Sequence, residues 1–197
     1  FFSEEDVAKY ETERGKSIPD HGTGYIPKPG DVKYKDLNND HKIDQYDVAA
    51  IGYPVYPLLT GGINLGFSYK GFDFSMTWSG ATKVSRLLDD IFREPFGATD
   101  SRSLMKYMID DMWTPEKGNS AKAPAISFTN KVNNYRDSDL WLRDASYLRL
   151  KNVEIGYNFP KKILSKINIG SLRVFATGYN LLTLDKLKIV DPESRPN

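Results

Sequence analysis

The feature that most constrains the fold is a strict alternation of apolar and polar residues between positions 62 and 79. Two alternating runs are separated by the dipeptide Lys70-Gly71. Because successive side chains of a strand point to opposite faces, this alternation predicts two β-strands. If Lys70-Gly71 forms a two-residue turn, the strands pair as a hairpin and every apolar side chain lies on one face. The predicted cross-strand pairs are Tyr69 with Phe72, Phe67 with Phe74, Leu65 with Met76 and Ile63 with Trp78.

Two kinds of β-protein accommodate such a hairpin. In a soluble sandwich, which is the commoner case, the apolar face packs against a second sheet. In a transmembrane barrel it contacts lipid, and the polar face meets the lumen. Each arm is about as long as the 9 to 11 residues of a spanning strand, and Tyr69 and Phe72 lie beside the turn, where an interfacial girdle of aromatic residues would be, which favours the barrel. We therefore predict that Ile63, Leu65, Phe67, Phe74 and Met76 face lipid, and that Asn64, Ser68, Asp73, Ser75 and Thr77 face the lumen.

Alternation resumes near the end of the sequence, over residues 147–159 and again over residues 172–179. The second run is less clean, because Phe175 and Tyr179 share a face with Arg173. The connector between these runs is short, whereas a long insertion precedes them. Short turns at one end and long loops at the other are typical of outer-membrane barrels. The predicted fold class is all-β and transmembrane: a portion of a large antiparallel β-barrel with long extracellular loops that carry short helices.

Composition narrows the possible functions. Aromatic residues make up 13% of the chain although its mean hydropathy is −0.51, a combination that suits strands with one apolar and one wet face. No apolar run approaches the roughly 20 residues of a spanning helix. The 27 Lys and Arg nearly balance the 26 Asp and Glu, so no nucleic-acid partner is indicated. Cysteine is absent and the only histidines are His21 and His41, which disfavours a thiol nucleophile, a catalytic triad or a multi-histidine metal centre.

Helices are expected only in the polar parts of the chain. One is predicted over residues 3–14 with Ser3 as its N-cap, and two more over residues 84–92 and 104–113. The first residues lack the features of a signal peptide, so either the chain is not exported or its beginning lies upstream. The predicted segments are an extracellular loop region (1–60), a transmembrane hairpin (61–79), a long extracellular loop with short helices (80–145), further transmembrane strands (146–190) and the start of a loop (191–197), after which terminal strands are missing.

Residues 36–47 place oxygen side chains at positions 1, 3, 5, 9 and 12 of an EF-hand-type loop, with the apolar Ile43 at position 8. Ca²⁺ takes several carboxylate and carbonyl oxygens, and Lys42 offers its backbone carbonyl. Against this, His41 replaces the usual glycine, and Asp47 is shorter than the usual Glu. The alternative is an Asx-rich turn whose carboxylates accept backbone N–H groups and bind no metal. A bound Ca²⁺ would be structural, with ligands from Asp36, Asn38, Asp40, Lys42, Asp44 and Asp47.

Three aromatic residues of the long insertion are candidates for substrate binding. Trp113, Tyr135 and Trp141 could stack on sugar rings, because an aromatic face suits apolar C–H groups. The commoner alternative is that they pack the insertion onto itself. No catalytic residue is predicted, because the adjacent carboxylates Asp89-Asp90 and Asp110-Asp111 point in different directions on a helix. The chain is therefore not expected to be an enzyme.

Several blocks, in order along nearly the whole chain, carry a family resemblance. They are residues 30–36 (GDVKYKD) with Asn38, Asp40, residues 42–44, Ile51-Gly52 and Pro54; residues 62–75; residues 113–116 with Ala123-Pro124; residues 144–153; residues 172–174; and residues 178–183. The ordered set resembles the SusC/RagA family of TonB-dependent outer-membrane receptors. Two features depart from the family pattern: His41 replaces a glycine, and the chain stops before the closing strand.

The resemblance implies the C-terminal part of a large barrel that is filled by an N-terminal plug. It further implies residence in the lipid of a Gram-negative outer membrane, energy from TonB, and a SusD-like surface lipoprotein as partner. The implied cargo is a glycan oligomer or, in some members, a peptide. Two rival functions are a soluble calcium-stabilised carbohydrate-binding β-module, which would not need detergent, and a hydrolase that uses loop carboxylates.

Overall fold

A computed structural model of the chain describes residues 3–22, 24–96, 103–127 and 131–194. The chain separates into two compact units, each built from two stretches of sequence. Gly52–Arg86 and Arg143–Pro196 form the first, here named the sheet unit. Phe1–Ile51 and Leu87–Leu142 form the second, here named the loop unit.

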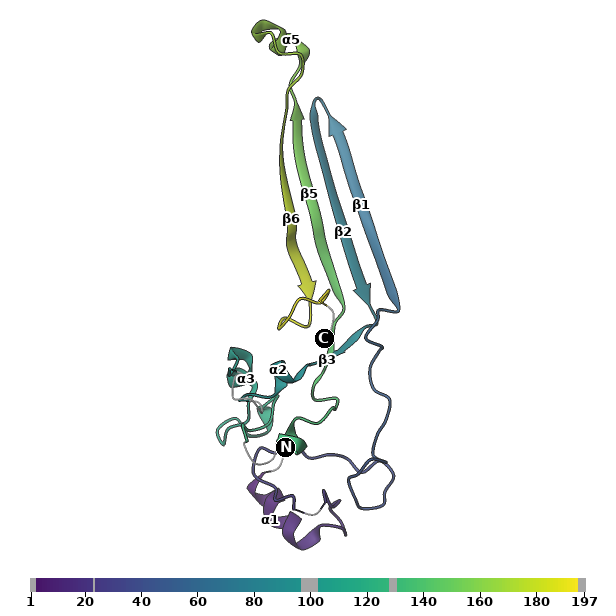
Figure 1. The fold of residues 1–197 in the computed structure, drawn as a ribbon, viewed down its shortest axis with the longest axis vertical. Coiled ribbons are helices and arrows are strands. Elements are labelled where there is room, and N and C mark those ends of the chain that lie inside the picture. Colours follow the sequence, from purple (N-terminus) through teal and green to yellow (C-terminus); the bar gives the residue numbers. More distant parts are fainter. Residues whose placement is uncertain (1–2, 23, 97–102, 128–130, 195–197) are drawn as a thin grey trace. The chain divides into compact units, whose positions relative to one another are not determined.

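The sheet unit is built on four antiparallel strands, which Figure 1 shows side by side. They are β1 (Leu59–Tyr69), β2 (Phe72–Thr82), β5 (Tyr147–Asn158) and β6 (Arg173–Asp185), in the order β1-β2-β5-β6. These strands hold 11, 11, 12 and 13 residues. Since a spanning strand needs roughly 9 to 11 residues, all four are long enough to cross a bilayer.

The β1–β2 hairpin has the predicted register. Lys70 and Gly71 have φ angles of 48° and 90°, as the two-residue type I′ turn requires. The rings of Phe67 and Phe74 lie opposite each other with centroids 5.4 Å apart. All four predicted pairs are confirmed: Tyr69 with Phe72, Phe67 with Phe74, Leu65 with Met76 and Ile63 with Trp78.

A bulge keeps the apolar face continuous across β5. The register between β2 and β5 shifts at Lys151, an extra residue that opposes no residue of β2. Such a bulge restarts the alternation one residue later. Val153 therefore lies opposite Met76 on the apolar face, rather than on the polar face with Arg149. Rows of opposed apolar residues then cross β2, β5 and β6: Phe72, Tyr157 and Val174 form one row, and Phe74, Ile155 and Ala176 form the next.

The apolar face of the sheet is open. Ile63, Leu65 and Phe67 are 60%, 50% and 63% exposed, and Ile155 is 54% exposed. A contiguous apolar surface of this kind is unfavourable in water and marks a face that contacts another apolar phase or a partner. The sheet unit thus reverses the burial expected of a protein surrounded by water.

Two short strands, β3 (Ser85–Leu87) and β4 (Leu142–Asp144), pair with each other. The helix predicted over residues 84–92 is therefore wrong at its start, and only α2 (Asp90–Arg93) is helical. The reason is that this backbone bonds across to a distant segment instead of to its own next turn. The N–H of Leu88, for example, donates to the carbonyl of Trp141 at 3.0 Å.

The other two predicted helices are confirmed, one of them over a shorter range. In α1 (Glu4–Glu13), the side chains of Ser3 and Asp6 each accept the other residue's backbone N–H, which is a capping box. α3 is limited to Lys106–Asp111. None of the helices in the described ranges combines the length and apolar character needed to cross a membrane.

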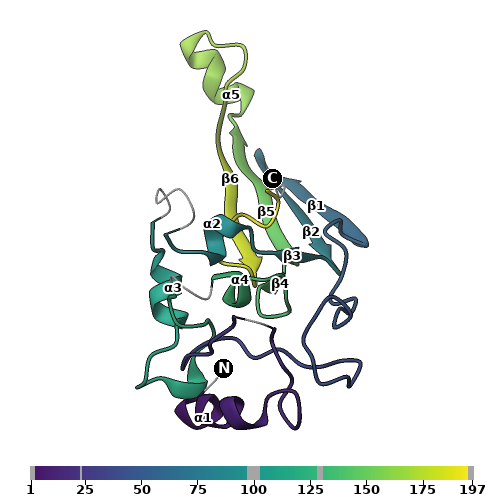
Figure 2. The same ribbon diagram turned by 60° about the horizontal axis from the view of Figure 1, so that its bottom comes forward.

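Short helical turns complete both units. Figure 2 shows the helices α1, α3 and α4 of the loop unit. The buried aromatic residue of α1 is Tyr10, which is 1% exposed. The remaining turns are η1 (Gly118–Ser120) and α4 (Lys131–Asn134) in the loop unit, and α5 (Lys161–Leu164) and η2 (Ser165–Ile167) between β5 and β6 in the sheet unit.

Candidate functional site

The polar face of the sheet carries charged side chains that pair across strands. Arg173 on β6 contacts both Asp73 on β2 and Glu154 on β5, the latter at 2.5 Å. Asn158 also donates to Asp73, at 3.0 Å. A Cβ at Gly156 would collide with the side chains of Asp73 and Arg173, so the glycine leaves room for this ion pair. One cation is thus held between two anions on the face predicted to be wet.

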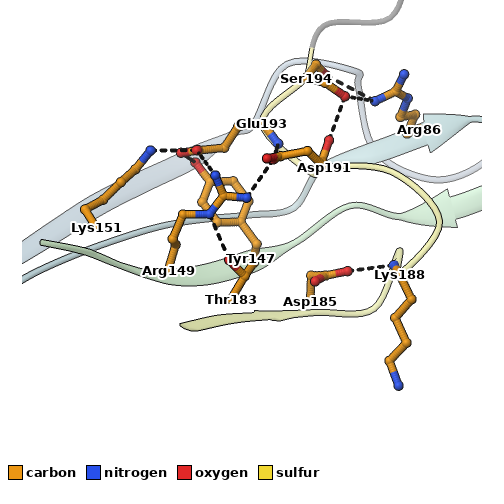
Figure 3. Close-up of polar contacts among 10 residues, drawn as sticks. All are labelled: Arg86, Tyr147, Arg149, Lys151, Thr183, Asp185, Lys188, Asp191, Glu193 and Ser194. Atoms are coloured by element: carbon orange, nitrogen blue, oxygen red, sulfur yellow. Dashed lines mark hydrogen bonds and ion pairs between the residues drawn. The ribbon is translucent and has the colours of Figure 1, made fainter. Parts of the chain in front are cut away.

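A second cluster of charges lies on the same face, near the opposite end of β5 (Figure 3). Its centre is Arg149, which is only 6% exposed. The Nε of Arg149 donates to Thr183 on β6 at 3.0 Å, while Nη1 and Nη2 donate to Glu193 at 2.5 Å and to Asp191 at 2.6 Å. A buried guanidinium needs such partners, because an unpaired charge is strongly unfavourable away from water.

Glu193 accepts from three residues of one strand. Besides Arg149, the Nζ of Lys151 contacts its Oε2 at 2.6 Å, and the hydroxyl of Tyr147 donates to its Oε1 at 2.8 Å. Burial raises the pKa of Glu193, but the bonds from Lys151 and Tyr147 and the charge of Arg149 outweigh it and lower the pKa. The pKa of Asp191 is also lowered, chiefly by its bond from Arg149. Both carboxylates are therefore ionised at neutral pH.

Both carboxylates belong to residues 186–194, which follow β6. This segment is here named the acidic strap after these two side chains. The side chain of Leu187 anchors its start and is 2% exposed. At its end, Nη1 of Arg86 donates to the hydroxyl and the carbonyl of Ser194 at 2.7 and 3.1 Å. The sequence predicted a loop from residue 191 onward and no role for these charges. The sequence signal that could have indicated this cluster was the pair of donors at Tyr147 and Arg149, which lie two residues apart on a predicted strand and therefore share a face.

The loop unit is organised around buried polar side chains. Asp31 and Asn134 are 1% and 0% exposed. The Asn134 side chain donates to Asp31 at 2.8 Å and accepts from the N–H of Val32 at 3.0 Å. Asp31 also accepts from the N–H of Lys28 at 2.8 Å. Because buried polar groups must find their hydrogen bonds inside the protein, these contacts fasten residues 28–32 to α4.

The three predicted substrate-binding aromatics pack within the loop unit. Trp141 is 2% exposed, and its indole donates to the carbonyl of Asn134 at 3.0 Å. The ring of Tyr135 lies 5.9 Å from that of Trp141, and burial raises the pKa of its hydroxyl to about 12. Trp113 packs against Gly30, where a Cβ would collide with the indole. Packing is the alternative that the sequence left open, and contact of these rings with substrate stays a prediction.

The predicted calcium ligands lie in one exposed loop that bonds to its own backbone. Asp36 accepts from the N–H groups of Asn39 at 2.6 Å and His41 at 2.8 Å. His41 has a φ of 65°, the left-handed conformation for which the usual glycine is suited. Further bonds within the loop run from the N–H of Asp40 to Asn38, of Lys42 to Asp40, of Tyr46 to Asp44, and of Leu37 and Asp44 to Asp47.

These bonds have an electrostatic consequence at the end of the loop. The pKa of Asp47 is lowered by the N–H groups of Asp44 and, next, of Leu37. Within the described part of the chain, no three His, Cys, Asp or Glu side chains are grouped so that they could hold a metal ion. Calcium binding by residues 36–47 stays a prediction.

Comparison with known proteins gives related sequences. No family model matches the chain. It is 30% identical to TonB-dependent receptor P3 of Formosa agariphila over 167 residues, which are 84% of this chain and 16% of that receptor. It is 27% identical to TonB-dependent receptor SusC of Bacteroides thetaiotaomicron over 168 residues, again 84% of this chain and 16% of the receptor. The chain therefore spans only a small part of the curated relatives it matches.

Solved structures are similar over the same extent. The structure of the RagAB peptide transporter has a TM-score of 0.59 and 28% identity, and the match covers 84% of this chain and 17% of that one. The RagAB peptide importer in the open-open state has a TM-score of 0.55 and 26% identity, over 89% of this chain and 18% of that one. Both units of the chain fall largely within the matched length.

Proposed function

We propose that this chain, which belongs to the SusC/RagA family of TonB-dependent receptors, forms part of the wall and the external loops of an outer-membrane importer. In this function β1, β2, β5 and β6 are spanning strands of a larger barrel. Their apolar face contacts lipid, and their polar face lines the lumen. The loop unit lies on the extracellular side, where the cargo arrives.

The observation that carries this proposal is the reversed burial of the sheet. Leu65 and Phe67 are at least half exposed, while Arg149 on the other face is 6% exposed. A barrel wall has this asymmetry, because one face meets lipid and the other a polar interior. Strands of about 11 residues that tilt by about 45° cover the roughly 25 Å of the apolar band.

Further strands would complete the wall at the two outer edges of the sheet, on β1 and β6. In lipid an open edge leaves backbone N–H and C=O groups without partners, which costs several kcal/mol for each group. Four strands alone therefore make an unfavourable membrane structure. The match covers only 16% of receptor P3, so a full-length protein of that size has room for the strands that would pair with β1 and β6.

The cargo, the energy source and the partner are proposed from the relatives. SusC is named a TonB-dependent receptor, and RagAB is described as a peptide importer. By analogy, this receptor imports oligomers of sugars or of amino acids, draws energy from TonB, and works with a SusD-like lipoprotein. We also propose that Ca²⁺ at residues 36–47 serves as a structural clamp and takes no part in transport.

The two rival functions fit the sheet less well. A soluble carbohydrate-binding sandwich would cover the apolar face with a second sheet, yet Ile63 and Phe67 remain largely exposed. A hydrolase would need a pair of carboxylates that are available to the substrate. On the polar face, Asp73 and Glu154 are both engaged by Arg173.

Uptake by living cells tests the proposed function. A strain that lacks the full-length receptor and a strain that lacks TonB are supplied with fluorescent oligosaccharides and peptides. We expect label entry to fall in both strains and to return when the receptor gene is restored. Unchanged uptake in the receptor-deficient strain would contradict import, and recovery of the receptor in the soluble fraction would contradict the barrel.

A further inference from the structure

The cluster around Arg149 has the chemistry of a carboxylate receptor. A hydroxyl, a guanidinium and an ammonium converge from Tyr147, Arg149 and Lys151, all on β5. Such groups bind carboxylates through short, charge-assisted hydrogen bonds. Thr183 on the neighbouring strand orients the guanidinium by accepting from its Nε at 3.0 Å. Because these groups stand on a hydrogen-bonded sheet, the site is preorganised.

The carboxylate that fills this receptor comes from the same chain. Both oxygens of Glu193 are bound, Oε2 by Arg149 at 2.5 Å and Lys151 at 2.6 Å, and Oε1 by Tyr147 at 2.8 Å. Glu193 is carried by the acidic strap, an irregular segment, and not by a strand. The donors stand on a rigid strand and the acceptor stands on a loop. This is the arrangement of a binding site that is occupied by a loop of the same chain.

Charge balance favours exchange of Glu193 for another carboxylate over its simple release. Arg149 and Lys151 supply two positive charges, and Asp191 and Glu193 supply two negative ones. Release without replacement would leave the buried guanidinium underpaired, which is strongly unfavourable. An incoming carboxylate restores the balance, whereas a neutral ligand does not. Water reaches the cluster, because the side chain of Asp191 is 54% exposed.

We propose that Tyr147, Arg149 and Lys151 form a carboxylate-binding site on the lumen face, which Glu193 occupies until a carboxylate of the cargo displaces it. This inference rests on the proposed function, since cargo meets this face only in an importer. The ligand is an oligomer that bears carboxylates. Either an acidic peptide or an oligosaccharide of uronic acids supplies that chemistry.

Binding to the purified full-length receptor in detergent tests the site. The acidic probes are hexaglutamate and a hexamer of galacturonic acid, and the neutral probes are hexaglycine and maltohexaose. Glu193 competes with a probe for the same donors and so lowers the receptor's apparent affinity for that probe. Glu193→Gln is therefore expected to tighten binding of at least one acidic probe by about tenfold in calorimetry. Adding Tyr147→Phe or Lys151→Gln to Glu193→Gln should weaken that binding again by about fivefold or more.

The matched control is Glu154→Gln, which removes a carboxylate from the same face but from the partner set of Arg173. It is expected to leave the affinity for all probes unchanged. Binding of hexaglutamate would identify an acidic peptide as the source of the carboxylate, and binding of the galacturonic acid hexamer would identify an oligosaccharide of uronic acids. Equal affinities of the wild type and Glu193→Gln overturn the site, as does tightening that extends to the neutral probes or to Glu154→Gln.

The gain of affinity expected for Glu193→Gln cannot arise from misfolding. Binding by the purified receptor is also independent of import by cells. If the site fails while uptake by the wild type is normal, only the carboxylate site is rejected. If the wild-type receptor supports no uptake, the proposed function is rejected.

Discussion

The sheet unit and the loop unit follow opposite rules of burial. In the sheet unit, Leu65 and Phe67 are largely exposed and Arg149 is buried among its ion partners. In the loop unit, Trp141 is buried and its indole is hydrogen-bonded, as in a protein surrounded by water. The difference is what the proposed function requires. In that function lipid meets one face of the sheet, while water surrounds the loop unit.

Substitution in the core of the loop unit should cause the greatest loss of stability. Trp141→Ala should lower its free energy of unfolding by about 3 to 5 kcal/mol, because a large buried ring is lost and a cavity is left. Hydrogen exchange of the loop-unit amides in the full receptor measures this. The control is Val132→Ala, since Val132 is 81% exposed and should contribute little. Equal effects of the two changes would show that the loop unit has no conventional core.

The second prediction contrasts the two faces of the sheet. Leu65→Arg should destabilise the receptor in lipid by about 2 to 4 kcal/mol, because it places a charge on the lipid-facing side. Ser75→Arg lies on the opposite face and should cost much less. Urea titration of the full receptor in lipid vesicles gives both values. Similar losses for both variants would mean that the two faces share one environment.

A smaller effect is expected from calcium at residues 36–47. Ca²⁺ at about 10 to 100 times its dissociation constant should stabilise the loop unit by about 1 to 3 kcal/mol. Asp36→Asn combined with Asp47→Asn should abolish this gain, whereas Asp89→Asn, outside the loop, should preserve it. The measurement is thermal unfolding with Ca²⁺ and with a chelator. Identical melting curves in the two buffers would reject the clamp.

The smallest effect is the response of the acidic strap to pH. The folded-state pKa values of Glu193 and Asp191 lie below their ordinary values of 4.5 and 3.8. Their stabilising contribution is therefore complete above those values and is lost as the pH falls through the lowered, folded-state values. Hydrogen exchange of residues 186–194 should show constant protection from about pH 7 to pH 5 and a loss below about pH 4. Unchanged protection at the acidic end would argue against the ion pairs.

Much of the sheet unit could be predicted from the sequence. A slip of one residue would move the apolar side chains of one strand to the polar face, and the two-residue turn at Lys70-Gly71 selects one register among those that remain, so the pairing was predictable. The bulge at Lys151 could not be predicted in the same way, because one inserted residue leaves the alternation intact on both sides of it. The helix predicted over residues 84–92 was wrong at its start because a short apolar run suits a helix and a buried strand equally well.

The contacts of the candidate sites were harder to predict than the strands. Asp31 and Asn134 are separated by 103 positions, and Arg149 and Glu193 by 44. These pairs meet because the fold brings them together, and no local periodicity marks them. The polar face on which Arg149 lies could be predicted, whereas the partner from the acidic strap could not. By contrast, the loop over residues 36–47 was predictable because its bonds are local.

In the proposed function one face of the sheet contacts lipid and the other contacts water, and this contrast can be measured along a single strand. This chain contains no cysteine. Once any cysteine elsewhere in the full receptor is replaced, single cysteines are introduced at successive positions of β1, residues 63 to 68. Spin labels at these cysteines report collisions with oxygen, which concentrates in lipid, and with a water-soluble nickel complex. We expect oxygen access to peak at Ile63, Leu65 and Phe67 and nickel access to peak at the residues between them. Equal access at neighbouring positions, or peaks in the reverse order, would show that the apolar face does not contact lipid.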